Sequence, residues 1–165
     1  TLEKKIISKI IKPTLKALKK RNNAYNGFLY VGLMIKNNEP YLIEYNIRMG
    51  DPECQVILPR LKTDIVKIFN NAVTNNLRKT KIEWIEKKSM TIVLCAKGYP
   101  GNYKKNLWIR NINNIKISKN SFIYHGGTKM TEGQLRSNGG RVLNITSIGT
   151  SFLQIRKSII SIIKK

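Results

Sequence analysis

Residue types suited to phosphoryl transfer lie close together in one short stretch of the chain. Glu44 and Asn46 are separated by one residue in an apolar run. Strand side chains alternate, so both would point to the same face of a strand. Carboxylate and amide oxygens are ligands that Mg²⁺ prefers. Arg48, one alternate position further, would add a guanidinium to that face. Metal ligands beside a permanent cation could stabilise a phosphoryl group during its transfer.

An acceptor-rich turn follows this strand and contains Asp51, Pro52 and Glu53. Only nine residues of the chain are acidic, so their grouping here is informative. Other interpretations remain open at this point. Glu44 and Asn46 could be a polar pair on an edge strand, and Arg48 could be a surface charge paired with a nearby carboxylate. Asp51 could serve its own loop by accepting local amide hydrogen bonds.

Composition limits the class of protein. The chain has 165 residues, enough for one domain or two small ones, and 41% of them are hydrophobic. No apolar run approaches the roughly 20 residues that span a bilayer. Cys54 and Cys95 lie far apart and form no metal-spaced pair, which indicates a reduced, cytoplasmic setting. The chain begins with Thr1 rather than methionine, so we expect a piece of a longer protein.

The formal net charge of +22 is high enough to suggest nucleic acid as a partner. The lysines are scattered, however, and do not form a stripe interleaved with aromatic residues. Lysine, asparagine and isoleucine all have AT-rich codons and are all abundant here. We therefore attribute most of the charge to genome composition, with a basic nucleic-acid-binding domain as the alternative.

Hydrophobic periodicity predicts an α+β fold. In the first part of the chain, a helix interrupted at Pro13 is predicted over 2–21 and a hairpin over 28–45. A loop over 46–59 and a second helix over 63–76 are predicted to follow. A subdomain boundary is expected in the polar stretch 78–89. A buried strand is then expected at 90–96 and a turn at 97–103. Short strands are expected at 107–109, 115–117, 121–125 and 141–145, and a closing helix at 151–163.

Five segments together resemble the phosphoribosylamine–glycine ligases, a family of ATP-grasp enzymes. In chain order, they read YNGFLYVGLMI, PYLIEYNIRMGDPECQVILPRLKTD, LCAKGYPGNY, IYHGGT and SNGGRVLNITSIG. The resemblance runs from about Lys12 to Gly149. It departs in one motif, where HGGT replaces the commoner HAGT. Only the C-terminal part of the family enzyme is resembled.

The resemblance implies a fold and an activity. Residues 1–80 would be the C-terminal half of an ATP-grasp domain, and residues 88–165 a small β-rich C-terminal subdomain. The family enzyme uses ATP and Mg²⁺ or Mn²⁺ to convert glycine to glycyl phosphate. The amine of 5-phosphoribosylamine then attacks, giving glycinamide ribonucleotide, ADP and phosphate in purine biosynthesis.

The resemblance also implies roles for individual residues. Glu44 and Asn46 match metal ligands, and Arg48 matches a basic position near the transferred phosphate. Met34 is the candidate to contact the adenine of ATP. The loop residues Asp51, Pro52 and Glu53 match the side that receives glycine and the ribosylamine.

Two glycine-containing turns could add phosphate contacts from backbone amides and a cation. They are Lys97-Gly98 and Gly139-Gly140-Arg141, although ordinary tight turns and a solvated lysine explain them equally well. The single histidine, His125, is interpreted as structural or interfacial, because no second ligand lies near it in the sequence.

The implied partners are glycine, 5-phosphoribosylamine, ATP and the N-terminal segments of the same enzyme, without nucleic acid or membrane. Without those segments, the 165-residue chain is expected to show no ligation by itself. A non-catalytic remnant or interaction module of the same enzyme is the other reading.

Overall fold

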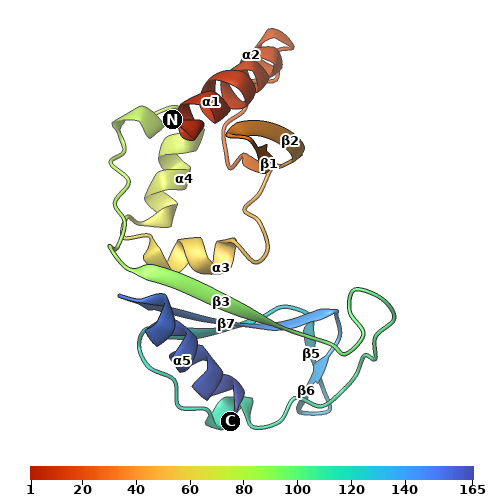
Figure 1. Cartoon of the computed structure of the whole chain (residues 1–165). Coiled ribbons are helices and arrows are strands. Elements are labelled where there is room, and N and C mark those ends of the chain that lie inside the picture. Colours follow the sequence, from red (N-terminus) through yellow and green to blue (C-terminus); the bar gives the residue numbers. More distant parts are fainter. The chain divides into compact units, whose positions relative to one another are not determined.

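The computed structural model describes residues 1–165 and confirms a mixed α+β fold (Figure 1). The chain divides into two compact units. The first comprises Thr1–Gly50 and Thr63–Ile82, and the second comprises Asp51–Lys62 and Glu83–Lys165. The chain therefore enters the second unit, returns to the first, and leaves it again after residue 82. The domain ranges 1–80 and 88–165 stay a prediction.

The N-terminal helix of the first unit is interrupted, as predicted. Helix α1, Leu2–Ile6, passes into a π-helical segment, Ile7–Ile11, and then into α2, Lys12–Lys20. Pro13 lies in the first turn of α2. Proline lacks an N–H donor and crowds the carbonyl of the preceding turn. A wider π turn before it accommodates this crowding while the backbone stays helical.

Strands β1, Tyr30–Lys36, and β2, Glu39–Asn46, form the predicted antiparallel hairpin. The turn between them consists of Asn37 and Asn38, which have φ angles of 51° and 60°. Two successive residues with positive φ match the right-handed twist of the strands, and asparagine tolerates this conformation. The turn thus fixes the register of the strand ends next to it, from the Lys36–Glu39 pair to the Leu33–Leu42 pair.

Helix α4, Ile65–Val73, completes the first unit and agrees with the predicted second helix. Asp64 caps it, because its Oδ1 accepts a hydrogen bond of 2.8 Å from the Val66 backbone N–H. Phe69 of α4 meets Phe28 edge to face, with ring centroids 5.7 Å apart. This contact joins the helix to the segment that leads into β1.

The second unit is built on a three-stranded antiparallel sheet (Figure 1). Its central strand is β7, Arg141–Gly149, flanked by β3, Lys88–Cys95, and β4, Ser121–His125. Helix α5, Phe152–Ile163, packs on one face. The core on that side contains the buried residues Leu143, Ile145, Ile155, Ile159 and Ile162.

The opposite face of the sheet contacts α3, Cys54–Ile57, which continues into a 3₁₀ turn, Leu58–Arg60. The sequence predicted a loop over 46–59, which is wrong for these residues. A helix of four residues has no helical periodicity to read and is marginal by itself. Contact with β3 and β7 stabilises it instead.

A second hairpin was not predicted. It consists of β5, Thr128–Thr131, and β6, Gln134–Ser137, and its polar strands lack an apolar alternation. The strand expected near 107–109 is only a single bridge between Trp108 and Arg136, and no strand forms at 115–117. No helix of the chain combines the length and the apolar character needed to cross a membrane.

Candidate functional site

Glu44 and Asn46 lie side by side on β2. Asn46 Nδ2 donates a hydrogen bond of 3.0 Å to Glu44 Oε1, so both side chains occupy one face, as strand alternation predicts. Glu44 is exposed and Asn46 is half-buried. Tyr45 between them points to the other face, where its hydroxyl lies 2.5 Å from Thr14 Oγ1 of α2. The carboxylate and amide are therefore open to a ligand.

The partner of Glu44 across the hairpin is Gly32 of β1. A Cβ atom on Gly32 would lie only 3.0 Å from Glu44 Cγ, so glycine leaves room for the carboxylate side chain. The register shifts after this pair because β2 carries an extra residue. Strand β1 keeps its own alternation, which puts Met34 on the same face as Gly32. Met34 is 58% exposed there.

Arg48 lies just beyond the end of β2, and its side chain is exposed. Its Nη1 donates a hydrogen bond of 2.9 Å to the backbone oxygen of Met49. This bond is local and holds the guanidinium near the chain's own bend. Arg48 belongs to the same compact unit as Glu44 and Asn46.

Asp51 belongs to the second unit and is held by two side chains. Arg141 donates from Nη1 to the Asp51 backbone oxygen at 2.9 Å, and its Nη2 lies 3.3 Å from Asp51 Oδ2. Gln55 Nε2 donates to Asp51 Oδ1 at 2.9 Å. Arginine contacts to a carboxylate and to the carbonyl of the same residue fix both its backbone and its side chain. Asp51 thus orders the start of α3.

Pro52 and Glu53 are half-buried at the N-terminus of α3. The Glu53 carbonyl accepts the hydrogen bond of 3.0 Å from Ile57 N that closes the helical turn. Cys54 follows, and burial together with the nearby Asp51 carboxylate raises the pKa of its thiol. The thiol form is therefore favoured, which argues against a nucleophilic role for Cys54.

Lys97 and Gly98 occupy the turn after β3, and both are exposed. Gly98 has a φ of 99°, and a Cβ atom there would overlap the Asn102 carbonyl oxygen. The Tyr99 N–H donates to the Ala96 oxygen at 3.0 Å and closes the turn. Glycine is therefore required by the turn itself, and a contact from this turn to phosphate stays a prediction.

A cavity of about 410 Å³ brings together residues that are distant in the sequence of the second unit. It is lined by Asp51, Gln55, Tyr99, His125, Gly126, Gly127, Gly140, Arg141 and Asn144. Gln55 and Asn144 had not been singled out from the sequence. Asn144 offered a signal, because it is a polar residue inside the apolar run Val142 to Ile145.

Two family models match the chain, one over its N-terminal part and one over its C-terminal part. Residues 1–54 match the phosphoribosylglycinamide synthetase ATP-grasp (A) domain, and residues 89–165 match the C domain of the same synthetase. The chain belongs to the phosphoribosylglycinamide synthetase family. The matched ranges contain the Glu44–Asn46 pair and the three-stranded sheet, respectively.

Relatives in this family are similar along most of the chain. A phosphoribosylamine–glycine ligase of Caldanaerobacter subterraneus is 42% identical over 152 residues, which is 92% of this chain and 36% of the relative. The Agrobacterium fabrum ligase is 43% identical over 143 residues, or 87% of this chain and 33% of the relative. The chain thus spans about a third of the length of these synthetase-family relatives.

A solved structure of the family has the same fold. The crystal structure of the phosphoribosylamine–glycine ligase from Thermotoga maritima matches with a TM-score of 0.73 and 34% identity. The match covers 96% of this chain and 39% of the Thermotoga chain. The fold described above is therefore that of a part of the phosphoribosylglycinamide synthetases.

Proposed function

We propose that this chain is part of an ATP-dependent ligase that joins glycine to 5-phosphoribosylamine through glycyl phosphate, yielding glycinamide ribonucleotide, ADP and phosphate in purine biosynthesis. The observation that carries the proposal is the Glu44–Asn46 pair, which is exposed on β2 within the range that matches an ATP-grasp domain. The ligase names of the relatives support the reaction.

The donor set of the pair fits Mg²⁺ or Mn²⁺. Glu44 supplies a carboxylate and Asn46 an amide oxygen, and both are hard ligands. No three His, Cys, Asp or Glu side chains of the chain form a metal cluster. A magnesium site with few protein ligands is ordinary, since this ion keeps waters and binds substrate phosphates. When bound, the cation would offset the charge of the phosphate oxygens of ATP.

The other candidate residues would bind and orient ATP and the two substrates. We assign Arg48 to the transferring phosphoryl group, because a guanidinium matches its charge and geometry. Met34, on the same face as Gly32 and Glu44, would contact the adenine. In the second unit, the start of α3 from Asp51 to Glu53 would line the glycine and ribosylamine side. Lys97 and Gly98 would supply a cation and backbone amides to an anionic substrate group.

The remaining ATP-grasp segments of the ligase are the proposed partner of the first unit. Strand β2 belongs to a two-stranded sheet and leaves Tyr41, Leu42 and Ile43 exposed. Isolated two-stranded sheets are marginal in water, and contiguous exposed apolar side chains indicate a covered surface. Both cysteines are free, which fits a reduced, cytoplasmic setting.

Substitution of the metal pair tests the proposal. Glu44→Gln keeps the shape of the side chain and removes its charge, so we expect ADP formation dependent on glycine and phosphoribosylamine to fall at least ~100-fold in the full-length ligase. Binding of Mn²⁺ to the 165-residue chain, followed by electron paramagnetic resonance, should weaken in parallel. Glu3→Gln, at an exposed position in the first turn of α1, is the matched control.

One outcome would contradict the proposal, and another would contradict only the expectation that the chain is inactive by itself. Turnover of Glu44→Gln near the wild-type level at saturating Mg²⁺ would remove the metal role. Formation of glycinamide ribonucleotide by the purified 165-residue chain alone would show that the earlier ATP-grasp segments are not needed. Tight, sequence-selective nucleic-acid binding at physiological salt would instead support the basic-domain alternative.

A further inference from the structure

A small antiparallel sheet in the second unit carries an aromatic side chain and cations on one face. The segment 106–110 pairs with β6 through the bridge between Trp108 and Arg136, and backbone hydrogen bonds of 2.8 Å flank the bridge on both sides. On the other side of β6, Arg136 pairs with Lys129 of β5. Residues that lie directly opposite one another point to the same face. Trp108, Arg136 and Lys129 therefore form one row across three chain segments.

A fourth side chain joins this row. Arg110 follows Trp108 by two residues and lies on the same face, with its guanidinium carbon 4.6 Å from the centroid of the indole ring. Trp108 is 50% exposed, and Arg110 and Lys129 are both exposed. We call Trp108, Arg110, Lys129 and Arg136 the Trp108 platform. It gathers three cations around one indole ring on an accessible face.

The platform holds like charges in direct opposition. The guanidinium of Arg136 donates to two neutral acceptors, a backbone oxygen at 3.0 Å and Gln134 Oε1 at 2.6 Å, which leave its charge in place. Lys129 lies opposite Arg136, and like charges in this arrangement destabilise a strand pair. Glu132, in the turn between β5 and β6, is the only acidic residue in the range 88–165. An anion bound at the platform would therefore relieve repulsion between Lys129 and Arg136.

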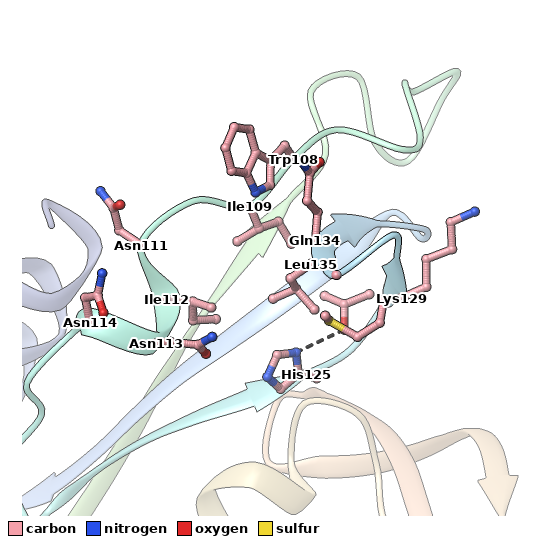
Figure 2. Close-up of a pocket in the computed structure, with 13 residues that line it drawn as sticks. Trp108, Ile109, Asn111, Ile112, Asn113, Asn114, His125, Lys129, Gln134 and Leu135 are labelled. Carbon is pink, nitrogen blue, oxygen red and sulfur yellow. Dashed lines mark hydrogen bonds between the residues drawn. The ribbon is translucent and has the colours of Figure 1, made fainter.

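The other face of the small sheet is anchored to the rest of the second unit. Ile109 packs against the hydrophobic core, and Leu135 lies on the same side because it adjoins Arg136 on β6. In Figure 2, the Trp108 ring and the Lys129 side chain extend away from Ile109 and Leu135, two of the side chains that line a cavity of about 630 Å³. The platform is thus fixed by packing on its far side and needs no ligand to form.

We infer that the Trp108 platform binds single-stranded nucleic acid without sequence preference. A base would stack on the exposed indole surface, and the three cations would contact the flanking phosphates. A single strand offers planar rings and phosphates at short, regular intervals, which is the combination that one indole among three cations fits. An acidic peptide supplies the charge without the ring.

The basic residues of the chain are scattered in the linear order, and strand pairing alone brings three of them to one tryptophan. The inference is independent of the proposed ligase function and uses none of the residues assigned to it.

Binding of short RNA oligomers to the 165-residue chain tests the inference. The chain has two tryptophans, so Trp84→Phe leaves Trp108 as the only one, and its emission should be quenched by a stacked base. Anisotropy of labelled oligomers measures affinity. We expect oligouridylate and oligoadenylate to bind within about threefold of each other, because stacking tolerates any base. Duplex RNA and uridine monophosphate should bind at least ~10-fold more weakly, since one hides its bases and the other offers a single phosphate.

Variants of the platform separate stacking from charge. Trp108→Leu should lower the affinity at least ~5-fold, and Trp108→Phe should restore most of it. Arg110→Gln and Lys129→Gln should each reduce the slope of log K against log salt concentration by about 0.7. Lys129→Gln should not lower the melting temperature, because it removes a repulsion. Arg156→Gln, at an exposed position of α5, makes the same change of charge elsewhere and is the matched control.

Several results would overturn the inference. Equal affinity for polyglutamate and oligouridylate would indicate a surface for any polyanion. Equal effects of Arg110→Gln and Arg156→Gln would show that the charge acts diffusely, as an origin in genome composition predicts. Unquenched emission of Trp108 at saturating oligomer would exclude stacking, and this readout needs no substitution in the platform. Equally tight binding of uridine monophosphate would indicate a mononucleotide site instead.

Discussion

Strands β2 and β7 both carry polar side chains, but those of β2 are mostly exposed and those of β7 are buried. Most of β2 is exposed in a two-stranded hairpin, and its candidate ligands Glu44 and Asn46 are open to solvent. Strand β7 is the central strand of three, and residues 142–147 on it are buried. An exposed carboxylate–amide pair is open to a cation from water, whereas a buried amide such as that of Asn144 needs its hydrogen-bond partners inside the protein. The two strands also differ in their contribution to stability, because β7 is part of the hydrophobic core of the second unit, whereas β2 is mostly exposed.

The largest expected effect tests that separation directly. Ile159 is 0% exposed beneath the sheet, and Ile43 on β2 is 63% exposed. Ile159→Ala should lower the free energy of unfolding by about 2–5 kcal/mol, because it deletes packed methyl groups and leaves a cavity. Ile43→Ala should change it by less than about 0.5 kcal/mol. Urea unfolding measures both, and equal losses would abolish the contrast between the packed core of the second unit, to which α5 contributes Ile159, and the exposed strand β2.

A second prediction concerns the glycine turns beside β7. Gly127→Ala should cost about 1–3 kcal/mol, because the added methyl group meets the Gly139 backbone, which has no rotamer to change. Gly126→Ala is the matched control, since its methyl group would also lie 2.9 Å from the Arg141 carbonyl oxygen but would not meet the Gly139 backbone. In thermal unfolding, the melting temperature of Gly127→Ala should be well below that of Gly126→Ala. The reverse order would mean that the close approach of the two turns is not rigid.

A smaller effect is expected at the start of α3. Arg141→Lys keeps the charge but replaces two guanidinium contacts to Asp51 with one at most. Both side chains are nearly half exposed, so the loss of unfolding free energy should not exceed about 1 kcal/mol. The Gln55 side-chain amide signals should nevertheless move, because Asp51 also accepts from Gln55. An unchanged spectrum would show that Arg141 does not order this segment.

The smallest expected effect belongs to the first unit and depends on pH. Hydrogen bonds from Lys5 and then Lys9 lower the pKa of Glu39 to about 2 from an ordinary 4.5. A lowered carboxyl pKa stabilises the folded state above pH 4.5, and this contribution is lost as pH falls from 4.5 toward 2. Carbon NMR titration of the Glu39 carboxyl measures it directly. Glu39→Gln should remove this contribution to the loss of folding stability at low pH and leave the contributions of the other carboxyl groups unchanged.

Local chemistry made much of the first unit predictable. Asparagines at the hairpin turn, an aspartate before α4 and a proline after the π segment each determine backbone geometry within a few residues. The same reasoning placed Glu44 and Asn46 on one face, since alternation along a strand needs no tertiary information. Their role as metal ligands stays a prediction, as do the other assigned site residues.

The parts that the sequence did not predict depend on distant contacts. Helix α3 is too short for periodicity and is held by the sheet of the second unit. The cavity joins residues near positions 51, 99, 126 and 144, which become neighbours only once β4 and β7 pair. Asn144 was visible as a polar residue in an apolar run, but only its burial shows that the amide oxygen lacks a partner.

The excursion of residues 51–62 into the second unit affects how this protein can be divided. A gene split or truncation between residues 82 and 83 would look natural from the linear order of the chain. It would separate α3 from the sheet and leave the polar side of β7 without its cover. The two halves of such a split protein would therefore have to remain associated, or the second half would have to keep its own copy of this short helix.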